Sequence, residues 1–263
     1  TEEPYDQDTR TTVSNWLEEC NRHELIEAFY KDQEFGTGGM RGICGPGTNR
    51  INNATIAAAT QGLSNYLIAN SSDLPSPLKV AIAFDSRHHS PELARVTAEV
   101  LAGNGIEALL YTELRPTPQL SFTVRHLGCA AGVVITASHN PPEYNGYKVY
   151  YSDGGQIVEP HDTGIISEVR KVNSLSEVKF ERSGSLITEL GPELDEAYRS
   201  KVLTLRQSTS LTQSGSDVCI VFTGLHGTGS VSVPQALENF GFRNVYEVAS
   251  QAIIDGNFST VSS

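Results

Sequence analysis

A serine, a histidine and a lysine that could carry out group transfer share one short segment, residues 136–150, TASHNPPEYNGYKVY. The Ser138 hydroxyl could act as a nucleophile or hold a phosphoryl group, the His139 imidazole could move protons, and the Lys148 ammonium could pair with phosphate oxygens. Two prolines stiffen the loop and restrict how the serine projects. An ordinary capped turn is the alternative, because Ser–His–Asn–Pro is also common turn chemistry.

A second segment that could bind an anion is rich in glycine: residues 35–50, FGTGGMRGICGPGTNR. Its Arg41 carries a planar guanidinium, which binds phosphate oxygens in pairs, although a surface charge among simple turns is also possible. Two other residues also have two possible roles each. Arg87 could form a structural ion pair or line a site, and His226 with its neighbouring glycines could form an anion nest or a contact between domains.

The Ser138 loop follows directly on an apolar strand at 130–137, and an alternating strand comes next at 146–152. Loops at the carboxyl ends of parallel strands are where α/β proteins place their sites. Further strands are predicted at 79–84 and 106–111, and helices at 8–30, 53–69, 90–105, 117–128, 159–172 and 192–205. We expect Asn53 and Ser90 to cap two of these helices. The alternation of strands and helices predicts the α/β class with a largely parallel sheet.

A polar run at 207–216, QSTSLTQSGS, is typical of a linker. We therefore expect residues 1–206 to form one domain and residues 207–263 to be the linker and the incomplete start of a second α/β domain. Two strands, at 217–222 and 244–249, with one helix between them cannot bury both faces of a sheet. The second unit is expected to expose apolar surface.

Composition narrows the choice of partners. The net charge of -12 argues against a nucleic-acid partner, although basic side chains that converge locally can still bind an anionic substrate. No apolar run approaches the ~20 residues that span a bilayer, so no membrane partner is expected. Four cysteines without a CxxC pair fit a reducing cytoplasm, where we expect the protein to act. Cys129 and Cys219 lie at apolar runs and are expected to be buried.

Several motifs together resemble one family. TASHNPPEYNGYK (136–148) is similar to the phosphoserine signature of the α-D-phosphohexomutases, the phosphoglucomutase/phosphomannomutase family. FGTGGMRG (35–42) resembles the family's N-terminal substrate loop, and FDSRHHSPELA (84–94) and LHGTG (225–229) resemble its phosphoglucomutase/phosphopentomutase branch. The resemblance covers essentially the whole chain. It implies a first domain with a mixed sheet between two layers of helices, followed by the start of a second, related α/β domain.

The resemblance also implies an activity. The family interconverts sugar 1-phosphates and 6-phosphates, with glucose preferred here and mannose possible, through a phosphoserine and a sugar bisphosphate that is both intermediate and activator. Ser138 would be the phosphoryl carrier, and an oxygen of its phosphate would be a ligand of Mg²⁺. Phosphoryl transfer needs positioning and charge neutralisation more than covalent participation, which fits this plan.

The resemblance also gives roles to other residues of the motifs at 35–42 and 136–148. Lys148 and Arg41 would contact the transferring phosphate. His139 would transfer a proton or orient a group. Three residues would bind substrate or hold the loop: Asn140, Thr37 and Gly38. The sugar phosphate is then the expected partner, and the sequence leaves the oligomeric state open.

One expected motif is absent from the 263 residues. The family's Asp-x-Asp-x-Asp-Arg magnesium loop has no counterpart, because Asp153, Asp195 and Asp255 are isolated. We expect the remaining metal ligands beyond residue 263 and regard the chain as the phosphoserine-bearing fragment, inactive on its own. A phosphopentomutase and a non-catalytic truncated binding module are the alternatives. A serine hydrolase is disfavoured, because the sequence has no GxSxG elbow.

Overall fold

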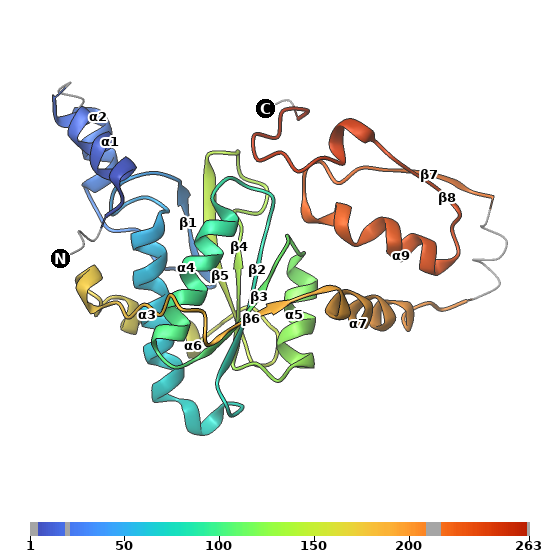
Figure 1. Ribbon diagram of the computed structural model, residues 1–263, viewed down its shortest axis with the longest axis horizontal. Helices are drawn as coiled ribbons and strands as arrows, with labels where there is room; N and C mark the ends of the chain where they lie inside the picture. Colours follow the sequence, from blue (N-terminus) through green and yellow to red (C-terminus); the bar gives the residue numbers. More distant parts are fainter. Residues whose placement is uncertain (1–4, 19–21, 209–216, 262–263) are drawn as a thin grey trace.

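The computed structural model describes residues 5–18, 22–208 and 217–261. Its larger part is a six-stranded mixed sheet with helices on both faces (Figure 1). The strands are β1 (Gly39–Ile43), β2 (Lys79–Phe84), β3 (Glu107–Tyr111), β4 (Ala131–Ile135), β5 (Tyr144–Tyr151) and β6 (Ile187–Leu190). The α-helices of this part are α1 (Gln7–Glu18), α2 (Arg22–Phe29), α3 (Asn53–Ala69), α4 (Ser90–Gly103), α5 (Thr117–His126), α6 (His161–Val169) and α7 (Pro192–Leu203). Short 3-10 turns are η1 (Ser71–Asp73) and η2 (Leu175–Glu177). The predicted α/β class with a layered mixed sheet is confirmed.

The order of the strands places the carboxyl ends of β2 and β4 side by side. Across the sheet the order is β1-β5-β4-β2-β3-β6, with β2 parallel to both β3 and β4 and with β5 antiparallel to β4 and β1. The chain leaves β2 through α4 to reach β3 on one side, and α5 brings it back to β4 on the other side. The carboxyl ends of β2 and β4 are therefore neighbours at the point where the connections diverge, which is where α/β proteins form binding crevices.

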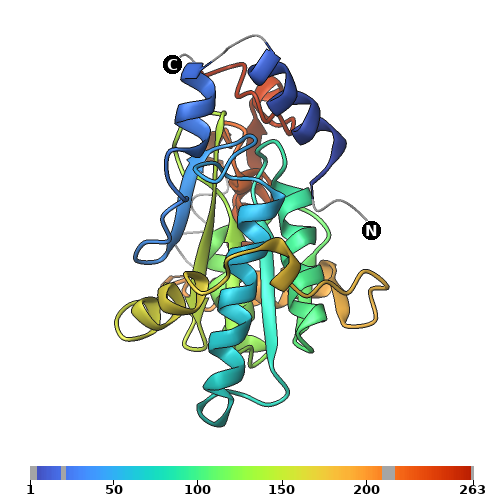
Figure 2. The same cartoon turned by 90° about the vertical axis from the view of Figure 1, so that its left-hand side faces the viewer.

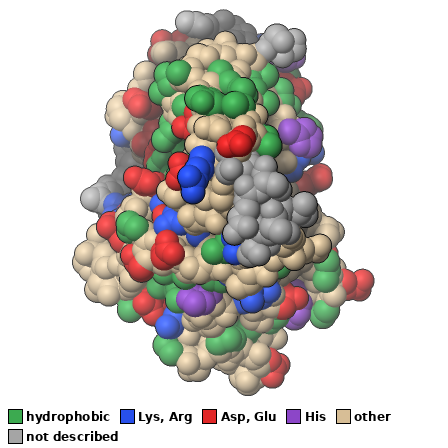
Figure 3. All heavy atoms as spheres, turned by 90° about the vertical axis from the view of Figure 1, so that its right-hand side faces the viewer, with side chains coloured by type: hydrophobic (Ala, Val, Ile, Leu, Met, Phe, Trp, Pro, Cys, Tyr) green, Lys and Arg blue, Asp and Glu red, His purple; other side chains and the backbone are tan. Residues whose placement is uncertain are grey.

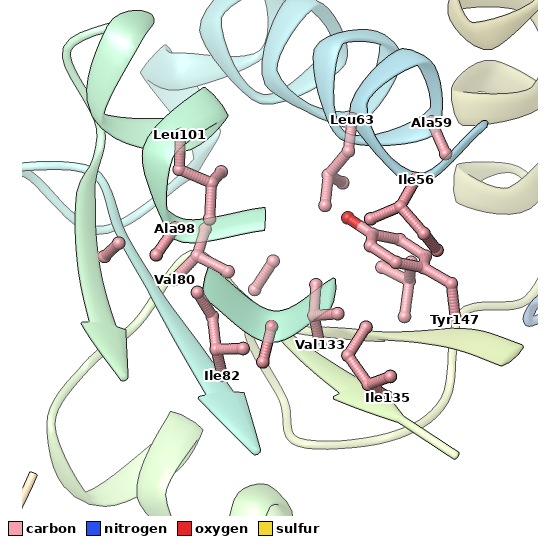
Figure 4. Close-up of a cluster of buried hydrophobic side chains, with 14 of the residues drawn as sticks. Ile56, Ala59, Leu63, Val80, Ile82, Ala98, Leu101, Val133, Ile135 and Tyr147 are labelled. Atoms are coloured by element: carbon pink, nitrogen blue, oxygen red, sulfur yellow. The ribbon is translucent and has the colours of Figure 1, made fainter. Parts of the chain in front are cut away.

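The central strands are apolar on both faces because helices cover both. Val80 and Ile82 of β2 belong to the core under α3 and α4, whereas Ala81 and Ala83 belong to the core under α5. Figure 4 shows the first of these cores, with the Tyr147 ring of β5 packed below α3. Figure 2 shows α3 on this face of the sheet between α4 and α6. Such two-sided burial produces the nearly continuous hydrophobic runs of the sequence.

The ends of two helices differ from the expectation. The side chain of Asn52, not Asn53, caps α3, and it forms a capping box with Thr55. His89, not Ser90, occupies the cap position of α4, with a left-handed backbone and no side-chain cap. The Ser90 hydroxyl instead donates to Asp85 (2.8 Å), so it serves the turn after β2 rather than the helix. No helix in the described ranges has the length and apolar character needed to cross a membrane.

The N-terminal region also differs from the expectation. The helix predicted at 8–30 corresponds to two helices, α1 and α2; no residue of α1 is buried, and Leu17 is 63% exposed. Part of the predicted glycine-rich loop forms the edge strand β1, where the hydrogen bonds of β5 override the low strand propensity of glycine. The short edge strand β6 was also missed.

The second unit is a small parallel sheet of β7 (Cys219–Phe222) and β8 (Asn244–Glu247) with α9 (Val233–Phe240), η3 (Thr228–Val231) and η4 (Ala249–Gln251). Val221 of β7 is 75% exposed and Tyr246 of β8 is 56% exposed. Cys219 is exposed as well, contrary to expectation, because two strands leave one face open. Figure 3, which views this side of the molecule, shows hydrophobic side chains gathered on the surface. Most of the predicted linker, residues 209–216, lies outside the described residues.

Candidate active site

Ser138 lies on the loop that follows β4, as the sequence predicts. Its side chain is exposed, whereas Ala137 before it is fully buried. Its backbone adopts the left-handed conformation, with a φ of 62°, which a non-glycine residue adopts only when its surroundings hold it there. The Thr136 hydroxyl accepts a hydrogen bond from the Ser138 amide (3.0 Å). The Ser138 Oγ lies 3.3 Å from Nδ1 of His139, so a proton can pass between the two side chains.

Arg87, in the turn after β2, holds this loop from behind. Only 3% of the residue is exposed. Its guanidinium donates to four backbone carbonyls of the loop: Nη1 to Pro141 (2.7 Å) and Tyr144 (2.9 Å), and Nη2 to Ser138 (3.3 Å) and Asn140 (2.6 Å). The guanidinium thus fixes the loop at both ends and in the middle.

Asp85 in turn holds Arg87. The Asp85 Oδ1 accepts from the Arg87 amide (3.0 Å) and from the Ser90 hydroxyl, while Oδ2 forms an ion pair with Arg87 Nε at 3.2 Å. This Nε contact is electrostatic, since its geometry is not that of a hydrogen bond. Burial lowers the pKa of Arg87, and the Asp85 carboxylate opposes that shift, so the guanidinium stays charged.

Arg41 comes to the same loop from the edge strand β1. Antiparallel pairing sets Arg41 opposite Gly146 of β5, and its Nη1 donates to Oδ1 of Asn140 (3.0 Å). Gly146 permits the close approach, because an added Cβ would lie 2.6 Å from the Met40 carbonyl oxygen and 2.7 Å from that of Thr136. The side chain of Arg41 is otherwise exposed and able to meet an anion in front of the loop.

Lys148 lies on β5, opposite Val134 of β4 and Gly39 of β1. The lysine is partly buried, so its side chain is not fully solvated. Burial lowers the pKa of Lys148, and the Arg41 guanidinium lowers it further. An anion bound near both cations would offset this repulsion.

Thr37 and Gly38 lie farther along the same strand pair. The Gly38 carbonyl accepts from the Val149 amide (3.0 Å) and from the Gln156 side chain (3.5 Å), so the glycine is held against β5. Its φ of 85° suits glycine, and Thr37 beside it is exposed. The structure thus brings Arg41, Asn140 and Ser138 together directly, with the Thr37–Gly38 turn anchored to the far part of β5.

The second unit contacts the turn after β2. The Ser86 hydroxyl donates to the backbone carbonyl of His226, His88 Nε2 lies 2.8 Å from Oδ1 of Asn257, and the Phe258 ring lies 5.0 Å from Cζ of Arg87. His226 is therefore a buried contact between the two units. Sequence reasoning missed Phe258, because a lone aromatic residue in a polar segment carries no pattern, and it left Arg87 undecided.

The resemblance implies Mg²⁺ on the Ser138 phosphate, and the described residues alone do not fit such an ion. No three His, Cys, Asp or Glu side chains gather into a possible metal site within the described ranges. Asp85, the carboxylate behind the loop, is already engaged by Arg87 and Ser90.

The fold and the loop define an α/β protein that presents an exposed serine at the carboxyl edge of a mixed sheet, on a loop that two arginines contact. The family model of phosphoglucomutase/phosphomannomutase α/β/α domain I matches residues 32–176. The chain belongs to the phosphoglucomutase/phosphomannomutase family.

Individual relatives agree with that assignment. A phosphoglucomutase from Staphylococcus haemolyticus is 37% identical, over 95% of this chain and 47% of the relative. The human phosphopentomutase is 34% identical, over 96% of this chain and 43% of the relative. A solved structure from Thermus thermophilus, described as a phosphomannomutase, superposes with a TM-score of 0.72 at 26% identity, over 88% of this chain and 48% of that one. The chain spans about half the length of the curated relatives it matches.

Proposed function

We propose that the protein containing this chain interconverts sugar 1-phosphates and 6-phosphates, with Ser138 as the phosphoryl carrier and glucose phosphates as the preferred substrates. One observation carries the proposal: an exposed serine hydroxyl projects from a loop held at four carbonyls, with Arg41 bonded to Asn140 of that loop and Lys148 on the strand that follows it. A rigidly held nucleophile beside two cations is the arrangement that phosphoryl transfer requires.

The first half-reaction moves the phosphoryl group to the sugar. A sugar hydroxyl oxygen bonds to phosphorus as the bond from phosphorus to Ser138 Oγ breaks; the hydroxyl loses its proton and Oγ gains one. His139, whose Nδ1 lies 3.3 Å from Oγ, is the nearest side chain able to supply that proton. Arg41 and Lys148 offset the charge of the moving group.

The second half-reaction restores the carrier. The bisphosphate turns around, and Ser138 Oγ bonds to its other phosphorus as the bond from that phosphorus to the sugar oxygen breaks; the proton of Oγ passes to His139, and the sugar oxygen gains a proton to become a hydroxyl. Phosphoglucomutases are generally Mg²⁺-dependent, and the ion would neutralise charge on the phosphoryl group when bound. We propose residues 1–206 as the phosphoserine domain and residues 207–263 as the linker and start of the next domain, with the remaining metal ligands outside this chain.

The test is Ser138→Ala in the intact protein, assayed with glucose 1-phosphate, Mg²⁺ and a bisphosphate activator. We expect loss of nearly all turnover, with the free energy of unfolding changed by only about 0.5 kcal/mol, because Ser138 is exposed. Ser174→Ala, at an exposed serine in the turn before η2, is the matched control and should retain full turnover. Turnover of the Ser138→Ala protein at the control rate would refute the carrier role.

A phosphopentomutase is the second candidate, favoured by the 34% identity to the human phosphopentomutase. The two candidates differ in the sugar and share the Ser138 chemistry. Comparing kcat/KM for glucose 1-phosphate and ribose 1-phosphate decides between them. A higher kcat/KM for ribose 1-phosphate would make the pentose phosphate the preferred substrate and would leave the carrier role of Ser138 unchanged.

A further inference from the structure

Two buried arginines lie at the carboxyl edge of the main sheet, and they are used differently. Arg115 is 4% exposed and forms a paired ion bridge with Asp195 on α7, through Nε (2.7 Å) and Nη2 (2.8 Å). Arg87 is 3% exposed and meets Asp85 through Nε at 3.2 Å, which leaves its two terminal nitrogens for other partners. They donate instead to four carbonyls of one loop, that of Ser138. Arg115 therefore joins two elements, whereas Arg87 sets the shape of a loop.

The loop shape fixed by Arg87 includes the unusual backbone of Ser138. The left-handed φ of 62° is disfavoured for serine, so contacts on each side must maintain it. On the amino side the Ser138 amide donates to Thr136 Oγ1 (3.0 Å), and on the carboxyl side the Ser138 carbonyl accepts from Arg87 Nη2 (3.3 Å). The direction of the Ser138 side chain follows from these two hydrogen bonds.

The second unit covers the guanidinium. The Phe258 ring lies 5.0 Å from Cζ of Arg87, within the range of a cation–π contact. Phe258 is itself held in a turn, because the Asp255 carboxylate accepts from the amides of Asn257 (2.9 Å) and Ser259 (2.9 Å). The aromatic cover shields the hydrogen bonds of Arg87 from water and strengthens them.

We propose that Arg87 is a positioning residue for phosphoryl transfer: covered by Phe258, it holds the Ser138 loop in the geometry that aims Oγ at the substrate. This inference rests on the proposed function of Ser138. Arg87 is buried behind the loop and acts through the four carbonyls. Lysine in its place keeps the positive charge but has no planar fork that can reach all four oxygens.

The experiment compares Arg87→Lys with Arg115→Lys in the intact protein. The rate of Ser138 phosphorylation by glucose 1,6-bisphosphate is measured by quench and intact mass, and amide hydrogen exchange is followed in the peptide covering 136–144. For Arg87→Lys we expect a phosphorylation rate about 100-fold lower, as for a misplacement of roughly 1 Å, with faster exchange in that peptide and little change in KM. For Arg115→Lys we expect a lowered melting temperature with an unchanged phosphorylation rate.

Phe258→Leu covers the case in which Arg87→Lys does not fold, because this position lies outside the main sheet. It should lower the phosphorylation rate about threefold to tenfold and raise exchange in the same peptide, as expected when a cation–π contact is lost. If each Arg87 or Phe258 variant that folds phosphorylates and exchanges like wild type, the positioning role is wrong. If wild type acquires no phosphate on Ser138, the proposed function is wrong instead. The measurement on wild type alone shows this, so the two failures can be told apart.

Discussion

The two sheets of this chain show what a site requires of its scaffold. In the main sheet, β2 and β4 are buried on both faces, and the loops at their carboxyl ends are joined by Arg87. In the second unit, β7 and β8 have one covered face, and Val221 is 75% exposed. The first arrangement can hold a serine in a disfavoured backbone conformation, because displacing its loop would break several buried hydrogen bonds at once. The second sheet leaves one face open, and the left-handed non-glycine residues of its unit, Leu225, His226 and Phe258, lie in the loops outside that sheet.

Matched substitutions of isoleucine test this difference between the main sheet and the second unit. Ile82→Ala removes a fully buried side chain of β2 and should lower the free energy of unfolding by about 2–5 kcal/mol. Ile254→Ala, at a side chain that is 67% exposed in the second unit, should change it by no more than about 0.5 kcal/mol. Denaturant unfolding of both variants measures these changes in the free energy of unfolding. Equal losses would mean that the second unit is packed more closely than its exposure indicates.

The site itself can be tested at Lys148. Lys148→Ala should lower turnover about 100-fold, as for loss of one preorganised donor to a developing charge, while Ser138 can still hold phosphate. Lys79→Ala, at the amino end of β2, which β4 separates from β5, is the matched control and should leave turnover unchanged. Steady-state kinetics and intact mass distinguish the two effects. A wild-type rate for Lys148→Ala would return Lys148 to an ordinary strand position.

A smaller effect is expected in the pH profile. Burial and then Arg41 lower the pKa of Lys148 below its ordinary value of 10.5, so the cation loses its proton at a lower pH than a free lysine would. Because the charged form binds phosphate, turnover should fall as the pH rises through that lowered pKa. Lys148→Arg keeps the charge and should shift the alkaline limb to higher pH, with a modest loss at neutral pH. If wild type and Lys148→Arg lose turnover at the same alkaline pH, the group that titrates there is not Lys148.

Much of the main sheet could be predicted, because its strands and helices carry clear periods. The strands β2, β3 and β4 and the helix α3 follow directly from apolar runs and caps, although the cap of α3 is Asn52 and not Asn53. The strand β1 could not be predicted, because its glycines are ordered by the antiparallel partner β5 and not by local preference.

The candidate site was predictable in part for a similar reason. Ser138, His139 and Lys148 share one segment and are visible together in the sequence, and Arg41 was added through the resemblance. The clamp by Arg87 depends on backbone carbonyls, which every residue possesses, so no sequence pattern reveals it. The cover by Phe258 depends on a contact between segments 171 positions apart, counted as 258 − 87.

If Ser138 is the phosphoryl carrier, phosphate passes through its hydroxyl during each turnover. The direct measurement loads the intact protein with labelled phosphate from glucose 1,6-bisphosphate, adds unlabelled glucose 1-phosphate, and follows the label on the peptide containing Ser138 by rapid quench. The account predicts that the label lies on Ser138 and leaves it at least as fast as the protein turns over. Label that stays on Ser138 through many turnovers, or that never reaches it in an active protein, would contradict the account.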